Sequence, residues 1–254
     1  MSARKGSRSL PARIVYDSLW TLSRALTLVL FGIRARFAGP VPAEGGLLVL
    51  STHQSHLDPV LLGVSMNRRL SSLARHSLYT FRPLGMLISA LDAVPIDRDA
   101  PGVAALRAII DRLRSGAAVV IFPEGTRTPN GRPQPLKNGF LVLARRSGVP
   151  ILPVAIVGAW ECWPRTRWFP VPGRVRLEFG RLIEPAEIAP LDDGALLALC
   201  AARLDELDRR GREALAPRAL SPRRALARDV RQLRHSAARQ ATAQPTERPL
   251  PPPA

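Results

Sequence analysis

The feature that most constrains this chain is a set of short, uninterrupted apolar runs that alternate with segments of helical periodicity. The runs "AAVVIF" at 117–122 and "PILPVAIVG" at 150–158 contain no charged side chain, which is typical of strands buried on both faces of a parallel sheet. Between them, 138–148 has apolar residues at helical spacing and ends at Gly148. Strands that alternate with helices predict an α/β fold, with a mostly parallel central sheet flanked by helices.

The same patterns recur along the middle of the chain. A chain of 254 residues, 46% of them hydrophobic, can bury the core of one sizeable domain with tails at its ends. Its only cysteines, Cys162 and Cys200, fit a reducing compartment better than a disulfide framework. We expect further strands at 47–51, 71–75, 93–97 and 174–180, and further helices at 59–66, 83–91, 101–116 and 193–210.

Positive charge is concentrated at the two ends of the chain. The net charge is +17; residues 1–37 carry seven Lys and Arg against one Asp, and 211–254 carry nine Arg against three acids, so the ends contribute +12. Such a balance indicates a polyanionic partner: a membrane phospholipid, a nucleic acid or a phosphorylated substrate. A nucleic-acid-binding protein is the remote alternative, because the Arg-rich tail has no aromatic residue on which bases could stack.

The first part of the chain predicts contact with a membrane. Apolar residues recur at helical spacing over 11–37, but the longest uncharged run, 25–33, is far shorter than the about 20 residues of a membrane-spanning helix. We expect amphipathic helices at a membrane interface, with Trp20 and Phe31 as anchors. Two alternatives stay open: an ordinary helix packed on the core, and a segment that spans the membrane. No small-residue cleavage pattern follows, so we expect no secretory leader.

These patterns divide the chain into three regions. We expect an N-terminal membrane-associating helical segment at 1–38 and a folded domain at 39–215. The remainder, 216–254, is rich in Arg and Pro, and we expect it to be mostly disordered.

The stretch "THQSHLD" directly follows the strand at 47–51, where ligands bind in an open parallel sheet. Histidine is the usual general base near neutral pH, and a carboxylate can fix its tautomer and support the imidazolium. His53 and Asp58 are five positions apart, so they can touch only if the chain turns between them, and the Asp-Pro pair suggests such a turn. Alternatives remain: Asp58 as a plain helix N-cap, a capping box from Ser55 to Asp58, and Ser55 as a nucleophile. The last is disfavoured because G-x-S-x-G is absent. His56 is more simply a neighbour than a base.

A second polar stretch, "FPEGTRT", follows the strand at 117–122. A turn at Gly125, the Thr126 hydroxyl and the Arg127 guanidinium could bind an anion, and Lys137 could reach the same anion. We expect Glu124 to be partly buried and to bond neighbouring donors or a substrate hydroxyl. The alternative is a solvated surface turn. Rossmann and P-loop patterns are absent and no residues have metal-ligand spacing, so we expect neither a metal nor a cofactor.

Taken together, these motifs resemble the glycerolipid acyltransferase family. "HQSHLD" matches its H-x4-D motif, and "VPIDRD" at 94–99 is similar to its second block, with Arg98 as the basic residue. "FPEGTRT" matches its third block and "VPILPVAI" at 149–156 its fourth, in the family's order. The resemblance covers about 40–185 and departs at Thr52, where Asn is common, and at Thr128, where Ser is common.

The resemblance implies a role for each matched residue. His53 would remove a proton from the acceptor hydroxyl and Asp58 would orient His53, while Pro153 would shape the acyl-donor side. The hydroxyl would attack the thioester of acyl-CoA or acyl carrier protein directly, with no acyl-enzyme. Substrate-binding residues would be Arg98, Glu124, Gly125, Thr126, Arg127 and Lys137.

The resemblance also implies a place in phospholipid biosynthesis. The expected acceptor is a 1-acyl-glycerol-3-phosphate, which would become phosphatidic acid, and the expected partners are this lysophospholipid, the acyl donor and an anionic membrane surface rather than nucleic acid. Glycerol-3-phosphate, another lysophospholipid or another lipid alcohol stay open as acceptors. We expect the enzyme at the cytoplasmic face of the cell membrane.

Overall fold

A computed structural model of the 254-residue chain describes residues 30–75, 94–96 and 103–216. The chain divides into two units, Met1–Leu215 and Ala216–Ala254, and the description below concerns the first. The segment before residue 30, the helix expected at 83–91, Arg98 and the tail from 217 lie outside the described residues. The three-region division therefore stays a prediction.

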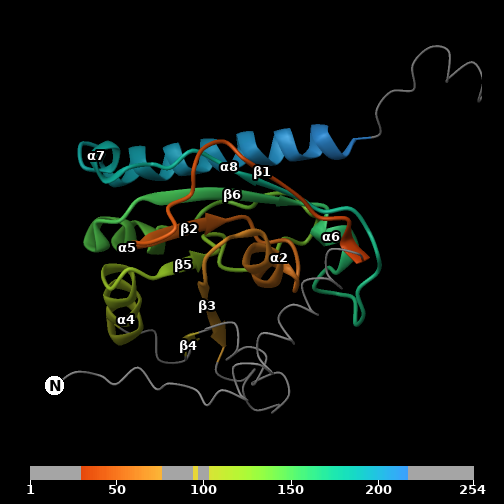
Figure 1. Ribbon diagram of the computed structural model, residues 1–254, viewed down its shortest axis with the longest axis horizontal. Coiled ribbons are helices and arrows are strands. Elements are labelled where there is room, and N and C mark those ends of the chain that lie inside the picture. The colour runs from red at the N-terminus through yellow and green to blue at the C-terminus, as the bar shows by residue number, and fades with distance from the viewer. Residues whose placement is uncertain (1–29, 76–93, 97–102, 217–254) are drawn as a thin grey trace, which may run out of the picture. The chain divides into compact units, whose positions relative to one another are not determined.

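A seven-stranded sheet forms the centre of the domain, and helices lie on its two faces (Figure 1). The strand order is β1-β7-β6-β2-β5-β3-β4. The strands are β1 (Arg34–Phe37), β2 (Leu47–Ser51), β3 (Leu70–Arg75), β4 (Val94–Ile96), β5 (Ala118–Ile121), β6 (Ile151–Val157) and β7 (Arg176–Phe179). The helices are α2 (Asp58–Ser65), α4 (Val103–Arg114), α5 (Gly139–Ser147), α6 (Ala159–Cys162), α7 (Pro185–Ile188) and α8 (Asp193–Leu215).

Most of the expected elements in the described residues are present. All six expected strands form, and the expected helices at 59–66, 101–116, 138–148 and 193–210 correspond to α2, α4, α5 and α8. Glycines set two of the helix ends: Gly116 follows α4 with φ 92°, and Gly148 caps α5 with φ 68°. Both φ values favour glycine, because a side chain is strained there. The short helices α6 and α7 were not expected.

The sheet is mixed, which corrects the expectation of a mostly parallel sheet. β2 pairs parallel with both β5 and β6, but β7 runs antiparallel to β6, and β1 then pairs parallel with β7. A parallel pair needs a crossover that carries the chain back across the sheet, usually on a long helix. The connection 158–175 contains only the four-residue α6, so the chain returns directly alongside β6 in the opposite direction.

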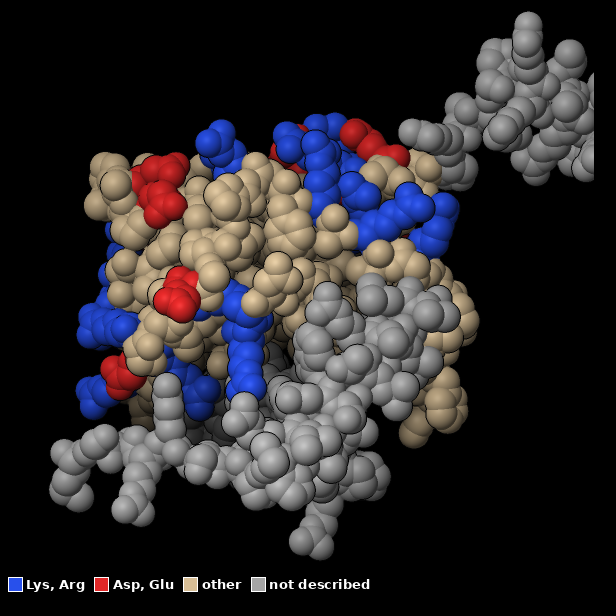
Figure 2. Space-filling view, viewed as in Figure 1, with Lys and Arg blue, Asp and Glu red and all other residues tan. Residues whose placement is uncertain are grey.

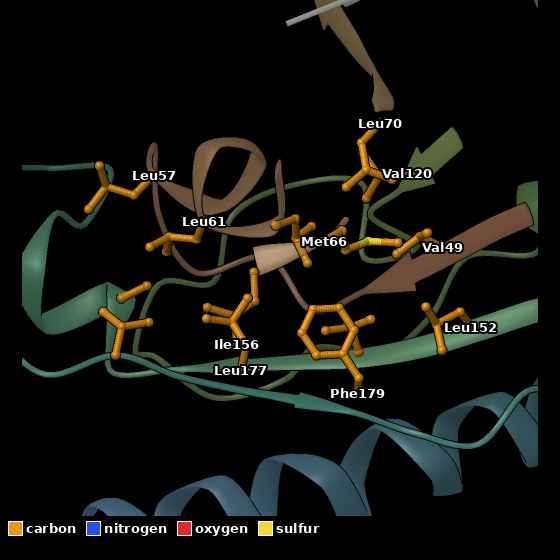
Figure 3. Close-up of a cluster of buried hydrophobic side chains, with 14 of the residues drawn as sticks. Val49, Leu57, Leu61, Met66, Leu70, Val120, Leu152, Ile156, Leu177 and Phe179 are labelled. Atoms are coloured by element: carbon orange, nitrogen blue, oxygen red, sulfur yellow. The ribbon is translucent and has the colours of Figure 1, made fainter. Parts of the chain in front are cut away.

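Alternate residues of the central strands point to opposite faces, and both faces are buried. Leu47 and Val49 of β2 belong to a cluster that also contains Leu61 of α2, whereas Leu48 and Leu50 belong to a second cluster with residues of α4, α5 and α8. Figure 3 shows the first cluster, where α2 side chains meet those of β2, β5 and β6. Burial on both faces explains why these strands read as uninterrupted apolar runs.

The N-terminal prediction fails at its last residues. Residues 34–37 form the strand β1 rather than the end of a helix, because the chain turns at Gly32, with φ 44°, and then pairs with β7. Phe31, expected to be a membrane anchor, is only 4% exposed and lies in the first cluster. Among the described helices, none combines the length and the apolar character that crossing a bilayer requires. Trp20 lies outside the described residues.

Basic side chains are unevenly distributed on the face shown in Figure 2, where they gather over the C-terminal half of α8 and beside α4 and α5. Several of those on α8 form ion pairs within the helix: Arg210 bonds Glu206 at 2.6 Å, and Arg212 bonds Asp208 at 2.6 Å. The Arg210–Glu206 pair is exposed and contributes little stability, whereas Asp208 is buried. Both pairs show that part of the positive charge is matched locally.

Candidate active site

The two motif-bearing loops lie side by side because their strands are neighbours. β2 and β5 pair parallel, so the chain leaves both strands at the same edge of the sheet. The His53 carbonyl accepts a hydrogen bond from the Thr128 N–H at 2.8 Å, and the His53 N–H donates to Glu124 Oε1 at 2.9 Å. His53 is therefore held by its backbone to the second loop.

The expected contact between His53 and Asp58 is present. His53 Nδ1 lies 2.7 Å from Asp58 Oδ2; the carboxylate side chain is fully buried and the imidazole is 19% exposed. A carboxylate accepts hydrogen bonds, so we assign the ring proton to Nδ1, which leaves the lone pair of Nε2 available to a substrate. This arrangement is the one a general base requires.

The same carboxylate oxygen organises the turn that the spacing requires. Asp58 Oδ2 also accepts the N–H groups of Gln54, at 2.6 Å, and of Ser55, at 2.8 Å. Helix α2 begins at Asp58 itself; the residue at its N-cap position is Leu57, which makes no side-chain capping bond. The plain N-cap is therefore wrong for Asp58, whereas the bond from the Ser55 N–H is the return bond that a capping box from Ser55 to Asp58 makes.

The other candidates in this loop have different partners. Ser55 is fully buried; its hydroxyl donates to the Trp163 carbonyl at 2.7 Å and accepts the Leu57 N–H at 3.1 Å. Both hydrogen bonds of the Ser55 hydroxyl stabilise the loop, and they do not support a nucleophilic role. The exposed His56 ring lies against the Trp163 ring, with 5.1 Å between centroids, so it is a neighbour of the dyad.

Phe122 fixes the plane of the His53 ring. The two rings are stacked, with 4.0 Å between centroids and 18° between planes. Because Asp58 holds one ring atom and Phe122 covers one face, the imidazole has little freedom to rotate. Sequence analysis included Phe122 in an apolar run and in the FPEGTRT motif but gave its side chain no role.

Glu124 is a buried carboxyl at the centre of the site. It is 3% exposed, and Oε2 has no hydrogen-bond partner among the described residues. The pKa of Glu124 is raised to about 7, chiefly by burial; the charges of Asp58 and Asp208 also raise it, and hydrogen bonds from the backbone of His53 and Gln134 lower it. The expected burial and bonding to neighbouring donors are thus present.

Gly125 and Lys137 are packed together. Gly125 has φ 72°, and a Cβ placed on it would lie 2.8 Å from Lys137 Nζ. The loop is closed by hydrogen bonds from Gly125 N–H to the Phe122 carbonyl, at 3.0 Å, and from Lys137 N–H to the Pro123 carbonyl, at 2.9 Å. Only a glycine allows the ammonium group this close to the turn.

Two further expected site residues, Thr126 and Arg127, follow Gly125 in the second loop. Thr126 is exposed and Arg127 is half-buried. Burial and the charge of Arg165 lower the pKa of Arg127, whereas Asp58 raises it, so the guanidinium lies within electrostatic reach of the dyad. The structure brings together seven of the eight expected site residues, while Arg98 lies outside the described residues. No group of three or more His, Cys, Asp or Glu in the described ranges could hold a metal ion.

Three buried polar residues to which sequence analysis gave no role lie in the two loops. Gln54 Nε2 donates to the Gly131 carbonyl at 2.9 Å, and its Oε1 accepts the Trp160 N–H at 3.3 Å. Thr52 Oγ1 accepts the N–H of Ile156 in β6 at 2.9 Å, and Thr128 is 1% exposed. The sequence signal that could have identified them is their position: Thr52 directly follows the buried strand β2, and Gln54 directly follows His53.

Known proteins are similar to this chain in sequence and in fold. A model of the Acyltransferase family matches residues 33–157. A 1-acyl-sn-glycerol-3-phosphate acyltransferase of Pseudomonas aeruginosa is 33% identical over 67% of this chain and 69% of its own length, and one of Bacillus subtilis is 27% identical over 69% and 85%. The crystal structure of the 1-acyl-sn-glycerophosphate (LPA) acyltransferase PlsC from Thermotoga maritima matches with a TM-score of 0.69 and 25% identity, over 85% of this chain and 86% of that one. With the motif order and the geometry of the dyad, these similarities show that the chain belongs to the glycerolipid acyltransferase family.

Proposed function

We propose that this O-acyltransferase moves a fatty acyl group from acyl-CoA or acyl carrier protein to the hydroxyl of a 1-acyl-glycerol-3-phosphate, making phosphatidic acid. The activity for which these relatives are named supports this acceptor. The observation that carries the proposal is the 2.7 Å contact between His53 Nδ1 and the buried Asp58 carboxylate. Beside this pair lies the second loop with its basic side chains, Arg127 and Lys137.

In the proposed mechanism His53 is the general base. Its Nε2 accepts the proton of the acceptor hydroxyl as the oxygen attacks the thioester carbonyl, and Asp58 stabilises the imidazolium that forms. The new C–O bond forms as the C–S bond breaks, and the proton passes to the departing thiolate. The acyl group goes directly to the acceptor, so no acyl-enzyme and no further cofactor are needed.

The second loop is the proposed site for the acceptor phosphate. Arg127 and Lys137 supply positive charge, while the Gly125 turn and the Thr126 hydroxyl supply hydrogen-bond donors. We propose Arg98 as a further cation of this site. Glu124 holds the His53 backbone in place, and its second oxygen is offered to a glycerol hydroxyl.

The acceptor class is tested with the purified full chain and radiolabelled oleoyl-CoA or oleoyl-carrier protein. The acceptors are lysophosphatidate, glycerol-3-phosphate, lysophosphatidylcholine and a lipid alcohol. We expect the highest kcat/KM with lysophosphatidate, and we expect Lys137→Ala to raise the KM for lysophosphatidate more than it lowers kcat. Equal turnover of lysophosphatidylcholine or of the alcohol, which lack a phosphomonoester, contradicts the phosphate site.

The base is tested separately. We expect His53→Ala to lower kcat by about 10²–10⁴ while the protein still folds. Near-normal turnover by that variant contradicts the assignment of His53.

Because the acceptor is a lipid and both donors are cytoplasmic thioesters, we place the reaction at the cytoplasmic face of the cell membrane.

A further inference from the structure

The connection between α6 and β7, residues 163–175 and here called the α6–β7 loop, presents large apolar side chains to solvent. Trp168 is 89% exposed, Phe169 77% and Val171 41%. They account for three of the seven large apolar side chains that are exposed in the described part of the chain. Two adjacent aromatic residues at such exposure indicate a surface that binds a partner.

The backbone that carries these rings is anchored. The Val171 N–H donates to the Cys162 carbonyl at 2.9 Å, and the Arg167 N–H donates to the Pro164 carbonyl at 3.2 Å. Trp163 Nε1 donates to the Arg167 carbonyl at 3.0 Å. The rings therefore project from a loop that is closed by its own hydrogen bonds and by the bond to Cys162 of α6.

The charge of the loop has one sign. Residues 162–175 contain Arg165, Arg167 and Arg174 and no Asp or Glu, and all three arginines are exposed. This differs from α8, whose arginines alternate with the acids that they bond. Aromatic side chains flanked by arginines fit an anionic phospholipid surface, where the rings enter the boundary between headgroups and acyl chains.

The size of the apolar patch favours a membrane over a protein. Two aromatic side chains bury about 300–500 Å² in total, whereas a stable protein interface needs about 800 Å² from each partner. An interfacial anchor needs only the rings and the neighbouring positive charge. We propose that the α6–β7 loop docks the domain on an anionic phospholipid bilayer through Trp168 and Phe169.

The loop adjoins the active site. The Trp163 carbonyl accepts the hydroxyl of Ser55, which stands two positions after His53, and the Trp163 ring lies against His56. Arg165 lies close enough to Arg127 for its positive charge to lower the pKa of Arg127. A docked loop therefore brings His53 to the bilayer, where a lysophospholipid resides. This last step rests on the proposed function, whereas docking itself does not.

The first test measures binding of the full chain to vesicles by flotation. The vesicles contain phosphatidylcholine with or without phosphatidylglycerol. We expect the W168S/F169S variant to partition to anionic vesicles at least about tenfold more weakly than the wild type. The matched control is Val103→Ser, which removes a 71% exposed side chain from α4 and should bind as the wild type does. Unchanged partitioning of the double variant counts against the proposal.

The second test reads the loop itself, so that binding by another part of the chain cannot mask the result. Thr166→Cys adds an exposed thiol, while burial raises the pKa of Cys162 to about 11 and that of Cys200 to about 12, which keeps both native thiols unreactive. An environment-sensitive fluorophore at 166 should shift to the blue on anionic vesicles and be quenched by nitroxide lipids. The same label at Ala104→Cys, on α4, should not respond.

Other occupants of the loop give different results. A blue shift without lipid that rises with protein concentration indicates a second copy of this chain, and a blue shift with acyl carrier protein but not with vesicles indicates the carrier; both overturn the proposal.

The activity assay separates docking from chemistry. W168S/F169S should lose at least about tenfold in rate on vesicle-borne acceptor and keep its rate on a water-soluble short-chain acceptor. If no acceptor is acylated, flotation and fluorescence still decide whether the loop docks.

Discussion

Glu124→Gln should change how the stability of the protein depends on pH. The wild-type carboxyl is 3% exposed, and burial raises its pKa from 4.5 to about 7. Gln keeps the oxygen that accepts the His53 N–H, now at 2.9 Å from Oε1, but it does not titrate. The amide places an NH₂ group where Oε2 has no partner in the described ranges. That cost does not depend on pH, so the informative quantity is the pH dependence of the difference between the two proteins.

The sign follows from where the proton is bound. Below pH 4.5 Glu124 is neutral in both the native and the unfolded chain. Between 4.5 and about 7 the unfolded chain ionises while the native one stays neutral, so raising the pH favours unfolding; above about 7 both are ionised and the loss is complete. A pKa difference of about 2.5 units corresponds to about 3 kcal/mol, most of which falls between pH 5 and 8.

The assay is urea unfolding of wild type and Glu124→Gln at pH 5, 6, 7 and 8, at constant ionic strength. The free energy of unfolding of the wild type, minus that of the variant, should fall by about 2 to 3 kcal/mol across this range. Glu161→Gln, which changes an exposed carboxylate on α6, is the matched control, and its difference from wild type should stay flat. A parallel pH dependence of wild type and Glu124→Gln would refute the reasoning, because it means that the carboxyl is solvated in the native state.

Three further substitutions test the site. Asp58→Asn should fold but lose about 10²–10⁴ in kcat, because an amide oxygen in the place of Oδ2 keeps the hydrogen bonds of the turn but carries no charge to stabilise the imidazolium that forms; initial rates and circular dichroism check this, and a loss below tenfold contradicts it. Ser55→Ala should lose less than about tenfold in kcat and about 1–3 kcal/mol of unfolding free energy, since the Trp163 carbonyl loses its hydrogen-bond donor. Complete loss of activity would instead support Ser55 as the nucleophile. Gly125→Ala should raise the acceptor KM about tenfold, since its Cβ displaces the Lys137 ammonium; an unchanged KM separates Lys137 from substrate binding.

The sequence predicted the local elements of the fold well, because burial on both faces leaves a signal that needs no distant information. The runs that became β2, β5 and β6 are apolar throughout, since their residues alternate between two buried clusters. The order of the strands has no such local signal. That β2 lies between β5 and β6 depends on which crossovers the helices make, so sequence analysis could place each motif loop after its own strand but not place the two loops beside each other.

The errors lie where tertiary contacts override the local pattern. Residues 34–37 continue an apolar, helix-spaced segment, yet they form β1 because β7 offers an unpaired edge. Phe31 reads as an anchor for the same reason, and the core buries it. The antiparallel β7 could not be predicted either, because a strand of alternating polarity such as 174–180 fits both directions.

The five-residue spacing of His53 and Asp58 follows from two demands on one carboxylate. Asp58 must bond the imidazole, and the same oxygen must hold the N–H groups of Gln54 and Ser55, which would otherwise be buried without partners. The second demand folds the chain back, so that a residue at the start of α2 reaches the ring that a straight helix would carry away from it. Catalytic geometry and turn stability therefore depend on one oxygen atom. It follows that Asp58→Ala should destabilise the fold as well as the base, whereas Asp58→Asn, which keeps an acceptor for the turn, should separate the two effects.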